Sequence, residues 1–233
     1  MDKDKALMDW IEKSKTFYRT RICEISSLFD ESDRMKEEGR TKTEIFEKEL
    51  EAAKLIEYSF TNYRAFGFQI RKAEALMMFR TRFNSLKALH SCFCMVYSSD
   101  GYNFPKDLIR EFQKLFEAIE PEERIFCRPE DEKNSLPDVL KVYRATESSP
   151  RKAKWEYSWT INLQCAGFFA ARRDPHIKIM EGEIKKADII AYTNERHEFE
   201  VIQYGKVYNI KEMAMSDKQK ESLMRDYKKE DEP

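Results

Sequence analysis

Apolar residues in the first half of the chain recur with the period of an α-helix. In the first run they are spaced three, four or seven residues apart: Met8, Ile11, Tyr18, Ile22, Ile25 and Phe29. This spacing places them on one helical face. Similar runs follow, separated by polar or glycine-containing breaks, at 45–63, 70–95 and 108–119. The pattern therefore predicts a helical domain of about four helices over residues 1–120.

The pattern changes after the polar stretch that begins Glu120-Pro121-Glu122. Short runs rich in β-branched and aromatic residues predict strands at 139–144, 157–161, 177–184 and 188–192. Asn162 is a predicted N-cap for a short helix over 162–172. Apolar runs on either side of Tyr204-Gly205 predict a β-hairpin. We therefore expect a strand-rich domain over 121–212, a charged helix or tail over 213–233, and an α+β fold overall.

Composition and charge limit the cellular location and the kinds of partner that we expect. The chain has 42 basic and 43 acidic residues, so its net charge implies no polyanionic partner. No apolar run approaches the roughly 18 residues of a membrane-spanning helix, and the N-terminus lacks a secretory signal. The five cysteines are scattered and the three histidines share no ligand spacing. We expect a cytoplasmic protein with free thiols, no metal and no membrane partner.

Several common catalytic signatures are missing from the sequence. It contains neither the Walker loop nor the G-x-G-x-x-G turn that bind phosphates. It also has no H-E-x-x-H zinc motif and no G-x-S-x-G nucleophile elbow. These absences weigh against most common hydrolase and kinase functions.

Three polar motifs lie on predicted strands of the second domain. In chain order they are Tyr143-Arg144, Ser158-Trp159-Thr160 and Glu198-Phe199-Glu200. On a strand, residues two apart face the same side, so the two carboxylates would share a face, as would the two hydroxyls. One carboxylate could then stabilise an oxocarbenium-like state while the other activates a nucleophile. An arginine nearby could bind a diphosphate through two hydrogen bonds.

This ordered set resembles the Arg–Ser–Glu class of mono-ADP-ribosyltransferases. That family has an aromatic-Arg strand, then Ser-x-Ser/Thr, then Glu-x-Glu at a late strand. Here Arg144, Ser158 and Glu200 follow one another at spacings of 14 and 42 residues. The resemblance covers about residues 138–211 and implies two packed sheets around an NAD cleft, with NAD as co-substrate. Trp159 is bulkier than the residue of many relatives and is expected to point away from the cleft.

The resemblance also implies a role for each matching residue. Tyr143 and Arg144 would bind NAD, the arginine at its nicotinamide-side phosphate or ribose. Ser158 would orient the catalytic carboxylate, and Thr160 would help to shape the nicotinamide-ribose pocket. Glu200 would be that carboxylate, and Glu198 would activate the incoming nucleophile. A loop would meet the target through Tyr192, Asn194, Arg196 and His197.

The expected function is therefore transfer of ADP-ribose from NAD to a macromolecule: protein arginine, RNA or DNA. The resemblance to this family further implies a bacterial or phage toxin or defence effector, with an antitoxin or other inhibitor as a partner. Two alternatives remain open at this stage. One is an NAD glycohydrolase that uses water as the acceptor, and the other is an inactive binding module on a transferase-like scaffold.

A basic, aromatic stretch over 63–90 admits two interpretations. Its six basic residues exceed its single acidic one by five, and phenylalanines interleave with them. Such a segment could bind a nucleic acid or an acidic partner. The interpretation we favour is an amphipathic helix whose aromatic rings lie in the core and whose charges face water.

Overall fold

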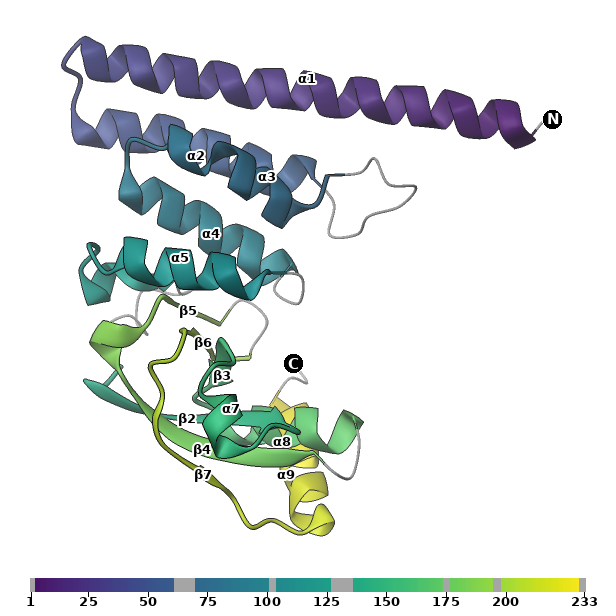
Figure 1. Ribbon diagram of the computed structural model, residues 1–233, viewed down its shortest axis with the longest axis vertical. Helices are drawn as coiled ribbons and strands as arrows, with labels where there is room; N and C mark the ends of the chain where they lie inside the picture. Colours follow the sequence, from purple (N-terminus) through teal and green to yellow (C-terminus); the bar gives the residue numbers. More distant parts are fainter. Residues whose placement is uncertain are drawn as a thin grey trace. The chain divides into compact units, whose positions relative to one another are not determined.

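The computed structural model describes residues 3–60, 70–100, 104–126, 136–173, 177–194 and 198–230 (Figure 1). The chain is mixed α and β, with helices first and a mostly antiparallel sheet after them, as the sequence predicts. It divides into two compact units, Met1–Phe104 and Pro105–Pro233. Within the described residues, no helix combines the length and the apolar character needed to cross a membrane.

The first unit consists of helices. Its elements are α1 (Lys3–Glu37), α2 (Lys42–Ser59), α3 (Lys72–Phe79), η1 (Arg80–Arg82) and α4 (Leu86–Asp100). Gly39, at φ 71°, turns the chain between α1 and α2. Thr41 then caps α2 in a capping box with Glu44. The helical run expected over 70–95 is in fact divided in two, with η1 and residues 83–85 between the parts.

A buried carboxylate explains why α4 begins where it does. Glu49 of α2 is fully buried and accepts hydrogen bonds from Ser32 Oγ at 2.8 Å, Asn84 N at 2.7 Å and Ser85 N at 2.8 Å. The two amides lie just before α4, where a helix leaves backbone N–H groups without internal partners. Glu49 therefore connects α1, α2 and the start of α4.

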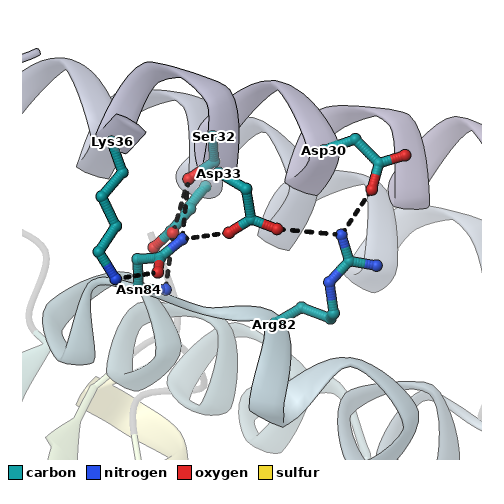
Figure 2. A network of polar contacts seen from close by, with 7 residues as sticks. Asp30, Ser32, Asp33, Lys36, Arg82 and Asn84 are labelled. Atoms are coloured by element: carbon teal, nitrogen blue, oxygen red, sulfur yellow. Dashed lines mark hydrogen bonds and ion pairs between the residues drawn. The ribbon is translucent and has the colours of Figure 1, made fainter. Parts of the chain in front are cut away.

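Further polar contacts join α1 to the segment before α4 (Figure 2). Asn84 donates to Asp33 Oδ1 at 2.7 Å and accepts from Lys36 Nζ at 2.8 Å. Arg82 donates to Asp30 Oδ1 at 2.7 Å. These bonds fix the irregular segment that separates α3 from α4.

The described part of the basic, aromatic stretch agrees with the interpretation we favour. Phe79 is buried, and the Phe83 ring packs edge-on against Phe29 with centroids 4.8 Å apart. Lys72 forms an ion pair with Glu57, and Arg82 is paired with acidic residues of α1. These two cations are therefore already neutralised within the first unit. Residues 63–69 of the stretch lie outside the described residues.

The second unit is built on one seven-stranded sheet. The strands are β1 (Ile125–Phe126), β2 (Val139–Thr146), β3 (Ser158–Thr160), β4 (Lys178–Lys185), β5 (Ala191–Thr193), β6 (Glu200–Ile202) and β7 (Tyr208–Glu212). Their order is β1-β5-β6-β3-β2-β4-β7; β1 and β5 are parallel and every other pair is antiparallel. A single pair, Tyr143↔Thr160, joins β2 to β3. Among the described residues the strands thus form one hydrogen-bonded sheet rather than two separate ones.

Helices complete the second unit: α5 (Lys106–Phe116), η3 (Pro121–Arg124), α7 (Pro150–Ala153), α8 (Leu163–Arg173), η4 (Lys186–Asp188) and α9 (Asp217–Glu230). The predicted N-cap of α8 is confirmed, because Asn162 Oδ1 accepts from Cys165 N at 2.9 Å. The expected charged C-terminal helix is α9. It packs on α8, where the Phe168 and Tyr227 rings lie 5.3 Å apart.

Two buried side chains attach the start of the second unit to its sheet. Gln113 of α5 donates to Asp188 O at 3.1 Å and accepts from Tyr204 N at 3.0 Å. Arg124 donates to four backbone carbonyls, at 117, 119, 187 and 189. The boundary that the sequence suggests at residue 120 therefore falls within the second unit, and α5 packs with the sheet.

The predicted hairpin at Tyr204-Gly205 is wrong. Strand β6 pairs with β3 and β5, whereas β7 pairs with β4 near the other edge of the sheet. The buried Gln203 side chain donates to Glu156 O at 2.7 Å and accepts from Lys206 N at 2.7 Å. These bonds and Gly205, at φ 69°, make a turn that directs the chain away from β6.

Substituting alanine for Gly182 is expected to destabilise the second unit by about 1–3 kcal/mol, the usual cost of overpacking. A Cβ at Gly182 would lie 2.5 Å from Val207 Cγ1 and 3.2 Å from Tyr208 O, at a register shift between β4 and β7. Urea unfolding of Gly182→Ala, Val207→Ala and the double variant measures this effect. Because Val207→Ala removes the clashing methyl, the double variant should cost less than the sum of the single variants. Additive losses would contradict the close approach.

Candidate functional site

Three neighbouring strands bring the central residues of the three motifs together. Strand β3 lies between β2 and β6, with Thr160 opposite both Tyr143 and Glu200. The motifs are far apart in sequence, but β3 carries its serine between the arginine strand and the glutamate strand. The predicted strand context of the motifs is therefore present at Arg144, Ser158 and Glu200.

A chain of hydrogen bonds connects these three residues. Arg144 Nη1 donates to the carbonyl oxygen of Ser158, and Ser158 Oγ donates to Glu200 Oε1. The Glu200 residue is only 5% exposed, whereas the Arg144 side chain is 26% exposed. The serine thus fixes a buried carboxylate on one side and a partly open guanidinium on the other.

The guanidinium of Arg144 retains hydrogen-bonding capacity. An arginine side chain has five N–H groups, and here Nε donates to Glu156 and Nη1 to Ser158. Within the part of the chain that the structure describes, Nη2 has no hydrogen-bond acceptor. Arg144 can therefore bind a further anionic group without giving up either of these bonds.

Glu156 is a member of the site that the sequence analysis missed. Besides Arg144 Nε, its carboxylate accepts from Thr146 Oγ1 at 2.9 Å and Ser148 Oγ at 2.5 Å. Burial by itself would raise the pKa of Glu156, but the Arg144 charge and the hydroxyl bonds hold it below its ordinary value. Its position two residues before Ser158, beside a predicted strand, is the only sequence signal that could have identified it.

Glu198 lies just outside the strand that was expected to carry it. Strand β6 begins at Glu200, and Phe199 between them has φ 48°, unusual for a residue other than glycine. Strand alternation therefore gives no support to a shared face for Glu198 and Glu200. A strained backbone of this kind tends to occur at functional sites, where the surrounding structure holds it. Here Phe199 N donates to Asn194 Oδ1 at 3.2 Å, and its carbonyl accepts from Ile161 N at 3.1 Å.

Thr160 and Trp159 contribute to the support of the site. Thr160 Oγ1 donates to Glu198 O at 2.6 Å and accepts from Asn162 N at 3.0 Å. This hydroxyl therefore connects the glutamate segment to the start of α8. Trp159 is buried in the core, as expected for the residue between the two hydroxyls, and its Nε1 donates to Glu156 O at 2.9 Å.

Two other residues border this group. Tyr143 is half-buried and packs against the buried cluster of Ala166, Ala170, Ile177 and Ile179. Burial, together with the nearby Glu198 carboxylate, raises the pKa of the Cys165 thiol to about 12. Cys165 therefore stays protonated at neutral pH and is a poor candidate for a nucleophile.

The residues expected to contact a target differ in how far they are buried. Tyr192 is only 2% exposed and belongs to the sheet core, so its side chain does not form a surface for a target. Asn194 is half-buried and holds the strained Phe199 through the bond described above. The expected contacts at Arg196 and His197 lie outside the described residues.

A shallow pocket of about 410 Å³ lies elsewhere in the second unit. It is lined by the start of β4, the end of β7 and the start of α9, and includes Lys178, Met213, Met215 and Lys220. None of the predicted site residues lines it. No group of three or more His, Cys, Asp or Glu side chains in the described ranges is arranged to hold a metal ion.

Comparison of the chain with protein-family models, with curated proteins and with solved structures finds no match.

Proposed function

We propose that the protein is a mono-ADP-ribosyltransferase, which cleaves NAD and transfers ADP-ribose to a macromolecule. The observation that carries this proposal is the hydrogen-bonded chain from Arg144 through Ser158 to Glu200 across three adjacent strands. A buried carboxylate can stabilise the positive charge that develops on the ribose, and a partly exposed guanidinium can bind the diphosphate. We further propose that the NAD cleft lies beside the point where the strand groups β1-β5-β6-β3 and β2-β4-β7 of this one sheet are joined by a single residue pair.

The chemistry follows from these two charges. The remaining N–H groups of Arg144 bind the diphosphate of NAD. The bond between ribose C1′ and the nicotinamide nitrogen breaks, and its electron pair leaves with nicotinamide. Glu200, fixed by Ser158 Oγ, stabilises the positive charge that develops on the ribose. The acceptor then bonds to C1′ and gives up its proton, for which Glu198 is the candidate base.

The biological setting belongs to the same proposal. Transfer of ADP-ribose to protein, RNA or DNA inside a bacterial cell suits a toxin or a defence effector of a bacterium or phage. A chain that is harmful to its own host would require a neutralising partner, such as an antitoxin.

Labelled NAD tests the proposal. The folded protein is incubated with a bacterial lysate and NAD carrying its label in the adenosine half, and nicotinamide release is measured. Protein, RNA and DNA fractions are then counted separately, with Arg144→Ala as the matched inactive variant. Label in one of the fractions, lost in Arg144→Ala, supports transfer and identifies the class of acceptor.

Two results would contradict the proposal. Nicotinamide release without transferred label would make the protein an NAD glycohydrolase. A folded, inhibitor-free protein that neither releases nicotinamide nor transfers label would instead be a binding module without activity.

A further inference from the structure

We propose that Glu156 is a positioning residue, which orients Arg144 so that its outer N–H groups face the diphosphate of NAD. This inference rests on the proposed function. It assigns a role to a carboxylate that none of the three sequence motifs contains.

The first argument is the way in which Glu156 is itself held. One carboxylate oxygen accepts from Arg144 Nε, and the other accepts from the hydroxyls of Thr146 and Ser148. The Glu156 side chain is 15% exposed, and its carbonyl oxygen accepts from Trp159 Nε1 and Gln203 Nε2. Both its backbone and its side chain are therefore fixed from several directions.

The second argument is the edge of the guanidinium that Glu156 occupies. Glu156 accepts from Nε, on the side of the guanidinium nearest the Arg144 backbone, and the Ser158 carbonyl accepts from Nη1. The N–H groups that remain include both on Nη2. A long arginine side chain loses much rotamer freedom when it is ordered, and a residue that orders it before binding lowers this cost for the ligand.

The third argument separates this role from a plain ion pair. A carboxylate placed only to neutralise Arg144 would weaken its attraction for a phosphate. A hydrogen-bond acceptor at Nε instead fixes the direction of the guanidinium, and this does not require the negative charge. The two roles predict different results when the charge is removed and the acceptor is kept: tighter binding of NAD for a neutralising role, and little change for a positioning role.

Glu156→Gln and Glu156→Ala make this distinction. A glutamine oxygen can accept from Arg144 Nε while its NH₂ donates to the Thr146 and Ser148 hydroxyls, which can also act as acceptors. Alanine provides no acceptor. Glu147→Ala, at an exposed glutamate in the same stretch of chain, is the matched control.

Steady-state NAD cleavage is measured for each variant, with the thermal unfolding midpoint as a check of the fold. We expect Glu156→Ala to raise KM for NAD about tenfold with kcat within about threefold, equivalent to about 1.4 kcal/mol of binding. Glu156→Gln and Glu147→Ala should stay within about threefold of the parent protein. An unchanged KM in folded Glu156→Ala, or equal defects in the two Glu156 variants, would overturn the assignment.

A measurement without NAD keeps this inference separate from the proposed function. In protein labelled with ¹⁵N-arginine, the Arg144 Nε–H signal is identified by its loss in Arg144→Lys. It should exchange slowly with water in the parent and in Glu156→Gln, and rapidly in Glu156→Ala. If the parent protein does not cleave NAD, the proposed function fails. If instead the Nε–H signal exchanges equally fast in all three proteins, the positioning role fails.

Discussion

Replacing Glu200 with glutamine is expected to lower kcat for NAD cleavage by about 10²–10³, the usual loss when a group that stabilises transition-state charge is removed. Glutamine keeps the size of the side chain and can still accept the hydrogen bond from Ser158 Oγ. It carries no negative charge, so the developing positive charge on the ribose is no longer stabilised. Binding of NAD, for which we propose Arg144, should change far less than kcat.

Single-turnover and steady-state measurements with purified protein separate these two effects. Glu221→Gln, at an exposed glutamate of α9, is the control for a general loss of charge. Ser158→Ala should give a smaller loss than Glu200→Gln, because it removes the support of the carboxylate and leaves the charge in place. A Glu200→Gln protein with the parent kcat would show that another group carries out the cleavage.

Replacing Glu49 with alanine is expected to destabilise the first unit by about 3 kcal/mol or more. The change leaves the fully buried Ser32 Oγ and the part-buried amides of Asn84 and Ser85 without their acceptor. Hydrogen bonds to charged groups contribute about 1.5–3 kcal/mol each, and an unsatisfied buried donor costs about 1–3 kcal/mol. Local unfolding of the first unit should therefore begin next to the start of α4, where both amides lie.

Hydrogen exchange and denaturant unfolding measure this effect. The amides of Asn84 and Ser85 should lose their protection in Glu49→Ala, and unfolding of the first unit should begin at a lower denaturant concentration. Glu51→Ala, at a side chain 57% exposed in the same helix, should change stability by less than about 1 kcal/mol. Equal losses in Glu49→Ala and Glu51→Ala would mean that the buried network does not stabilise the unit.

Local signals in the sequence located most of the elements, and long-range partners account for the errors. Helical spacing identified the buried face of α1 at Ile25 and Phe29, although Met8 of the same run is exposed, and the side-chain chemistry of Asn162 marked the start of α8. Tyr204-Gly205 correctly indicates a turn, but a turn signal does not specify which strand the next segment pairs with. That choice depends on the bond from Gln203 to the Glu156 carbonyl and on the contact of Val207 with Gly182. In both cases the two residues are far apart in sequence.

The candidate site shows the same limit. Arg144, Ser158 and Glu200 could be found because their motifs occur in order on β-rich segments. Glu156 could not, because a single glutamate beside a strand looks like an exposed surface residue until Arg144 and two hydroxyls are known to face it. The sequence places Tyr192 next to a loop and so predicts that it contacts a target, but its side chain lies in the core of the sheet. An aromatic residue beside a loop does not by itself show which way it faces.

The attachment of α5 to the sheet has a consequence for the evolution of the chain. The hydrogen bonds of Gln113 and Arg124 to the segments around the sheet, as described above, go to main-chain atoms at residues 117, 119, 187–189 and 204. Every amino acid offers the same carbonyl, and every one except proline the same amide. Substitutions at those main-chain positions, proline at 204 excepted, therefore keep these hydrogen bonds available, whereas substitution of the glutamine or the arginine removes them. Divergent homologues should retain this pair even where the surrounding sequence has become unrecognisable.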